Sequence, residues 1–187
     1  QSGVASGRDF ETIGREVGEA LRRAFDGADV TLMWRTSDGD KARALYLVED
    51  GRSIEIPPFP LAPLAAIVQR LERGEAITWQ STDEARAAGV PRGPQGTRAA
   101  SGVLVPVRVG EYTVGSITLE SAARTAAFGR AEERVLRTIA GTLAGALENA
   151  RLFDETQRLL KETEARNAEL AVINSIQQGM AAELDFQ

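Results

Sequence analysis

The residues that could perform chemistry in this chain are few, because the sequence contains no cysteine and no histidine. Thiol nucleophiles, disulfides, Cys/His zinc sites and the usual general base near neutral pH are therefore excluded. Acidic pairs such as Glu49-Asp50 and Asp83-Glu84 remain. We expect them in turns or on solvated helix faces, not in the concave pair that a glycosidase needs. Residues 92–97 lack the lysine of a phosphate-binding loop. The sequence thus predicts no catalytic residues, no metal site and no enzyme.

Two side chains are better suited to ligand binding. Arg98 stands between a loop rich in glycine and proline and a predicted strand, where a guanidinium can hold an anionic group in a fork. Trp79 can stack on a flat ligand. The alternatives are a surface arginine or an ion pair for Arg98, and a core or rim position for Trp79. Both residues are therefore candidates for ligand contacts.

Alternating and helical patterns predict the elements that would position these candidates. Apolar residues at three- and four-residue spacing predict a first helix from Asp9 to Phe25. Shorter helices are expected at 62–73 and near 82–89, and strands at 30–34, 42–48, 53–56 and 76–79. The clearest signal is a hairpin with strands at 103–109 and 112–120, in which Pro106 must lie at an edge or a bulge. Together these segments predict an α+β domain.

Composition restricts the class of protein further. Of the 187 residues, 43% are hydrophobic and 26% are charged, which is typical of a globular domain. A net charge of −5 argues against binding to nucleic acid. No apolar run is long enough for a membrane span and no signal peptide opens the chain, and the lack of cysteine fits the reducing cytoplasm. We therefore expect a cytoplasmic protein. Residues 1–8 are interpreted as a flexible N-terminal segment or a cloning remnant.

The C-terminal part is expected to be one long helix. No proline follows Pro106, and a helical pattern continues from Arg130 to about Ala181, a length of roughly 75 Å that no small domain can bury. Seven-residue spacing beyond residue 150 predicts a parallel, homodimeric coiled coil with two competing registers. The alternative is a long solvated helix without switching. The expected dimer interface comprises Leu152, Phe153, Thr156, Leu159, Leu160, Thr163, Asn167, Leu170, Ile173 and Asn174.

Several of these segments, in this order, resemble the GAF family of sensor domains. Arg98 and Ser101 lead into an apolar strand that ends near Pro106, and a short turn and a strand with an early glycine follow. Residues 128–133 resemble the family's entry into its last helix. Residues 146–153 resemble the junction into a signalling helix, and 169–178 resemble a linker to a following domain. The resemblance covers about residues 9–149.

The resemblance implies an antiparallel sheet of five or six strands flanked by helices, followed at 150–187 by a signalling helix that leads to a missing downstream domain. It implies a non-catalytic sensor of a bacterial multidomain signalling protein, such as a two-component histidine kinase or a nucleotide cyclase. The alternative is a ligand-free module for dimerisation and spacing. Without cysteine for a bilin or histidine for haem, no cofactor is expected, and the Asn-Lys pair of cyclic-nucleotide binders is missing. The implied pocket residues are Trp79, Gln95, Thr97, Arg98, Ser101, Arg108 and Thr118.

Overall fold

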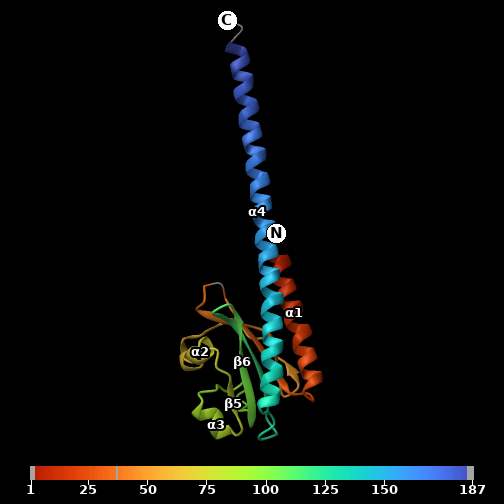
Figure 1. Cartoon of the computed structure of the whole chain (residues 1–187), viewed down its shortest axis with the longest axis vertical. Helices are drawn as coiled ribbons and strands as arrows, with labels where there is room; N and C mark the ends of the chain where they lie inside the picture. The colour runs from red at the N-terminus through yellow and green to blue at the C-terminus, as the bar shows by residue number, and fades with distance from the viewer. Residues whose placement is uncertain (1–2, 37, 185–187) are drawn as a thin grey trace.

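The computed structural model describes residues 3–36 and 38–184, which form an α+β domain with a long helical extension (Figure 1). The elements in chain order are α1 (Gly3–Ala24), β1 (Asp29–Arg35), β2 (Lys41–Glu49), β3 (Arg52–Ser53), β4 (Phe59–Pro60), the 3-10 turn η1 (Ala62–Leu64), α2 (Ala65–Glu72), β5 (Ile77–Trp79), α3 (Thr82–Ala87), β6 (Ser101–Val109), β7 (Tyr112–Ser121) and α4 (Arg130–Leu184).

One antiparallel sheet with the strand order β3-β2-β1-β7-β6-β5 organises the domain, and β4 pairs with the outer part of β2. Helices α1 and α4 lie side by side on one face of this sheet, and α2 and α3 lie on the other (Figure 1). The first turns of α1 lie beside the middle of α4, and the second half of α4 extends away from the domain. The sheet is therefore the middle layer of three.

The alternation of side chains along the central strands explains the two faces. Val30, Leu32, Ile117 and Leu119 are buried with apolar residues of α4, such as Leu136, in the main core between the sheet and the two long helices. Because successive side chains of a strand point to opposite faces, the residues between them turn toward α2. A smaller core on that side includes Ile67, Leu71, Ile77 and Trp79.

The predicted elements are confirmed, with differences at their ends. Helix α1 begins at Gly3, earlier than the expected Asp9. The expected strand at 53–56 is reduced to the two-residue β3. The six strands of the main order confirm the predicted sheet, and β4, which was not predicted, adds a seventh beside β2. Pro106 lies where expected: β5 pairs with β6 only as far as Leu104, so at Pro106 strand β6 pairs with β7 alone, next to a bulge.

Gly115 on β7 offers a test of this packing. A Cβ added there would collide with the main-chain oxygen of Met33 on β1, because the two strands approach closely at this point. We expect Gly115→Ala to lower the free energy of unfolding by about 1–3 kcal/mol, as overpacking does. Gly129→Ala is the control, since its Cβ would meet nothing nearer than 3.5 Å. Equal thermal denaturation midpoints for the two variants would contradict the close approach.

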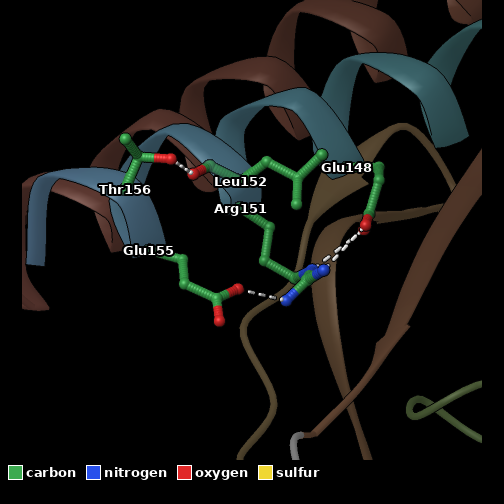
Figure 2. Close-up of polar contacts among 5 residues, drawn as sticks. All are labelled: Glu148, Arg151, Leu152, Glu155 and Thr156. Carbon is green, nitrogen blue, oxygen red and sulfur yellow. Dashed lines mark hydrogen bonds and ion pairs between the residues drawn. The ribbon is translucent and has the colours of Figure 1, made fainter. Parts of the chain in front are cut away.

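Helix α4 leaves the domain after Leu147, which is its last buried residue among those described. Arg151 follows one turn later and donates hydrogen bonds of 2.8 and 2.9 Å to Glu148 and of 3.0 Å to Glu155 (Figure 2). The Arg151 guanidinium also holds the pKa of Glu148 below its usual range. Side-chain pairs at three- and four-residue spacing favour the helical state. This set of ion pairs therefore supports an unbroken helix across the junction.

Candidate ligand cavity

A cavity of about 440 Å³ lies between the sheet and the side of the domain that carries α2. Its floor consists of the alternate residues of the central strands that do not enter the main core, and α2 forms one wall. The segments at 56–61 and 90–94 complete its rim. Residues from these parts include Thr31, Met33, Leu47, Ile56, Phe59, Leu64, Ile67, Val68, Leu71, Trp79, Val90, Leu104, Ser116 and Thr118. The lining is mostly apolar with a few hydroxyl groups, as is typical of small-molecule sites.

One end of the cavity floor is acidic. Thr31 of β1 pairs with Leu47 of β2, and two residues further along this register Asp29 comes beside Glu49. On its other side Asp29 pairs with Glu120 of β7. Side chains at paired positions of neighbouring strands point to the same face, so three carboxylates form a row across three strands. We call this set the acidic row.

The three members of the acidic row have different surroundings. Asp29 accepts backbone hydrogen bonds from Asp50 and Gly51, of 3.0 and 3.2 Å. Glu49 is only 7% exposed; its Oε2 accepts a hydrogen bond of 3.0 Å from the Gln95 amide, while its Oε1 has no partner among the described residues. Glu120 lines the cavity itself. Two of the three carboxylates therefore retain oxygens that can accept further hydrogen bonds.

Glu120 has the most altered acidity. Burial, together with the negative charges of Asp29 and Glu49, raises its pKa to about 7. Both effects penalise the ionised form, since a carboxylate in apolar surroundings loses hydration and like charges repel. Arg92 is the other charged residue among the described ones that line the cavity, and its Nη1 donates to the Gly96 carbonyl oxygen. Near neutral pH, Glu120 therefore changes between its charged and uncharged forms.

Trp79 continues the same row on the opposite side of Glu120. Glu120 pairs with Gly102 on β6, and Gly102 pairs with Trp79 on β5. A Cβ at Gly102 would collide with the indole ring of Trp79, so the glycine leaves the space that the ring occupies. Trp79 is fully buried, and its Nε1 donor has no partner among the described residues. The row thus combines unpaired acceptors with an unpaired donor.

The structure places two of the seven predicted pocket residues, Trp79 and Thr118, in the cavity lining. The other five lie outside it. Arg98 donates through Nη1 to the Val90 carbonyl oxygen at 3.0 Å and so fastens the loop before β6. Arg108 donates to the Glu111 carbonyl oxygen at the hairpin turn.

Gln95, Thr97 and Ser101 form structural contacts. The main chain of Gln95 donates to Glu49, and the carbonyl oxygen of Thr97 accepts a hydrogen bond from Gly93 within the loop. Ser101 is fully buried. Its hydroxyl donates to the Arg124 carbonyl oxygen at 2.6 Å and accepts from the Ala127 amide at 3.1 Å, which ties β6 to the segment before α4.

Sequence reasoning missed the acidic row and misplaced one of its members. Glu49 was expected with Asp50 in a solvated turn, but it is the buried last residue of β2. The expectation was wrong because β2 continues one residue further into the domain than the apolar pattern indicates. Part of the row could have been predicted. Ser116, Thr118 and Glu120 lie at two-residue spacing in one strand, so their side chains are expected on the same face of the sheet.

The predicted dimer residues all lie on the exposed surface of the described chain. The larger apolar ones remain about half exposed, from 43% for Ile173 to 65% for Phe153. No described helix is both long enough and apolar enough to cross a lipid bilayer. The described acidic residues also do not cluster in a way that could hold a metal ion.

The domain thus combines one antiparallel sheet, a cavity on one face of it, and on the other face a long helix that extends beyond the domain (Figure 1). The family model described as "GAF domain" matches residues 7–148, and the chain belongs to this family. No curated protein sequence matches the chain significantly.

Solved structures of low sequence identity share the fold. A segment of a methyl-accepting chemotaxis protein superposes with a TM-score of 0.62 at 12% identity, covering 76% of this chain and 90% of that one. The blue-light-absorbing form of the PixJ GAF domain of Thermosynechococcus elongatus gives 0.63 at 14% identity, covering 84% and 96%. A free methionine-R-sulfoxide reductase of Thermoplasma acidophilum gives 0.51 at 14% identity, covering 75% and 96%. GAF domains are generally regulatory modules, and the last structure shows that the fold also supports catalysis.

Proposed function

We propose that this chain is a non-catalytic sensor that binds a small molecule in the cavity and transmits its state through α4 to a downstream domain. The cavity itself carries the proposal. It is large enough for a small organic molecule, and its lining combines apolar walls with a few fixed polar groups. The chain has neither cysteine nor histidine, so the cavity holds no thiol nucleophile and no imidazole base.

The position of the cavity relative to α4 supports transmission. Leu104 and Thr118 line the cavity, while the neighbouring residues of the same two strands, Val105 and Ile117, pack in the core that includes Leu136 and Leu147 of α4. A ligand that shifts β6 or β7 therefore pushes on the helix that leaves the domain. Cores are close-packed and pass such displacements on.

A parallel homodimer through α4 belongs to the same proposal. Four threonines, Thr138, Thr142, Thr156 and Thr163, lie along one side of the helix and donate to carbonyl oxygens four residues earlier, at 2.8–3.1 Å. At 3.6 residues per turn this side is opposite to the one that faces the sheet. Since their hydroxyls are satisfied within the helix, these threonines can be covered by a partner without leaving an unpaired donor.

Two glycines on the same side of α4 also favour a partner helix. A Cβ at Gly141 or Gly145 would meet nothing within 4 Å in the single chain. A glycine inside a helix costs about 1 kcal/mol relative to alanine, and the packing of the domain does not require it here. The close approach of a second α4 would explain why glycine occupies these two positions.

A thermal-shift screen of aromatic and alicyclic compounds tests the sensor function. A cavity ligand at 100 times its Kd should stabilise the native chain by about 2.7 kcal/mol, or roughly 5–10 °C in the melting temperature. Val68→Trp fills the cavity from α2 and should abolish the response, whereas Ala66→Trp on the exposed side of α2 should retain it. If no compound stabilises the chain, or if Val68→Trp responds equally, the alternative of a ligand-free dimerisation and spacer module is the better one.

A further inference from the structure

The acidic end of the cavity restricts the charge of the molecule that the cavity can hold. Glu120 lines the cavity, Glu49 is 7% exposed with one carboxylate oxygen unpaired, and Asp29 lies between them in the strand register. The nearest lining residue of the loop is Gly93, where a Cβ would collide with the Glu49 carboxylate. Glycine thus allows the loop to close directly over the acidic row.

An anion at this end would be unfavourable. It would add negative charge beside two or three carboxylates in apolar surroundings, where like charges interact strongly. A neutral apolar group would leave the oxygens of Glu120 without donors, and an unpaired buried polar group is costly. A protonated primary amine has three N–H donors and a positive charge, so it satisfies the Glu120 oxygens and relieves the repulsion between the carboxylates.

The remaining walls specify the rest of the molecule. Helix α2 contributes Ile67, Val68 and Leu71 to the lining, β6 contributes Leu104, and β5 contributes the buried indole of Trp79. These groups require an apolar body, and Trp79 favours an aromatic one. Arg92 is the positive lining residue, and it is engaged with the Gly96 carbonyl oxygen at the opening of the loop.

We propose that the cavity selects organic amines, with an apolar or aromatic body against α2 and Trp79 and the protonated nitrogen against the carboxylate of Glu120, beside the negative charges of Glu49 and Asp29. The proposal rests on the function proposed above, because it names the class of molecule that the sensor binds. It also reverses the charge expected from Arg98, whose guanidinium is held by Val90 outside the cavity.

Three probes of matched shape test the proposal: tryptamine, which is a cation; tryptophol, which is neutral; and indole-3-acetate, which is an anion. Isothermal titration of the full chain at pH 8 should give tryptamine an affinity about 10- to 100-fold higher than that of tryptophol, as expected for one charge-assisted contact. Indole-3-acetate should bind more weakly than both. Equal affinity for tryptamine and tryptophol would overturn the charge preference and leave the sensor function intact, because the cavity would still bind a ligand.

Variants and pH assign the effect to the acidic row. Glu120→Gln should lower tryptamine affinity about 10- to 100-fold while leaving tryptophol unchanged, whereas Glu111→Gln, a substitution in the exposed hairpin turn, should change neither. Between pH 6 and pH 8 Glu120 ionises while the amine stays protonated, so tryptamine affinity should rise in the native chain and stay constant in Glu120→Gln. The proposal would be overturned if tryptamine affinity changed neither with Glu120→Gln nor with pH, or if tryptamine did not bind at all. The screen with Val68→Trp then decides separately whether the cavity is a ligand site.

Discussion

Replacing Glu120 by glutamine should remove most of the pH dependence of stability that the chain shows between pH 5 and pH 8. In the folded chain the pKa of Glu120 is raised to about 7, whereas the ordinary pKa of a glutamate is 4.5. Between these values the folded state binds more protons than the unfolded state, so the free energy of unfolding falls as the pH rises. A shift of this size corresponds to about 3 kcal/mol, and water in the open cavity reduces it through screening. At pH 8 Glu120→Gln should therefore be the more stable protein.

Few other side chains contribute to the pH dependence of stability in this range. The chain has no histidine and no cysteine, which are the side chains that otherwise titrate in this range. Glu75, Glu132 and Glu148 have pKa values lowered by hydrogen bonds to their carboxylates, so the stability they contribute is lost only at more acidic pH.

Chemical denaturation at pH 5, 6, 7 and 8 gives the result directly. The curves of the native chain and of Glu120→Gln should coincide near pH 5 and diverge by pH 8, with Glu111→Gln following the native chain. Parallel curves for all three proteins would show that Glu120 ionises normally in the folded state. Glu120 would then be ionised throughout this pH range, and the acidic row would carry its full negative charge at neutral pH.

Local patterns were sufficient to predict most elements of this fold. The hairpin at 103–109 and 112–120 was identified because its alternation, its glycine turn and its proline all agree with one structure, and β6 and β7 confirm it. Helix α4 follows from its uninterrupted helical pattern. The two-residue strand β4 was missed because the prolines at 57, 58 and 60 favour extended backbone but are unusual in paired strands, and its pairing with β2 cannot be read from its own sequence.

The acidic row could not be predicted, because it depends on sheet register. Asp29, Glu49 and Glu120 belong to three strands whose order, β2-β1-β7, is not readable from any one of them. Asp29 begins β1, Glu49 ends β2 and Glu120 is the last residue but one of β7. A polar side chain at or near a strand end is ordinary and gives no signal by itself. Arg98, in contrast, was selected as a ligand-binding candidate because of its sequence position between a loop and a strand. Its guanidinium instead fastens the loop to the Val90 carbonyl oxygen.

Substitution of both Leu159 and Leu160 by glutamate should convert the proposed homodimer into a monomer. These residues are 50% and 52% exposed in the single chain and belong to the two alternative heptad registers, so the pair places a charge in the interface whichever register forms. An uncompensated buried charge costs about 3–5 kcal/mol, which weakens association at least about 100-fold. Light scattering at tens of micromolar measures the change in mass.

The matched control adds the same charges outside the interface. Gln157 and Ala165 are exposed on other sides of α4, and their joint replacement by glutamate should leave the dimer intact. Removing all residues after Phe153 should leave a folded, largely monomeric domain, because Leu147 is the last buried residue of α4 among those described. A native chain that is monomeric at tens of micromolar would contradict the dimer, and the large apolar side chains beyond residue 150 would then need another partner. If the truncated domain loses its cooperative melt, the extension is part of the fold, and α4 supports the sheet as well as transmitting its state.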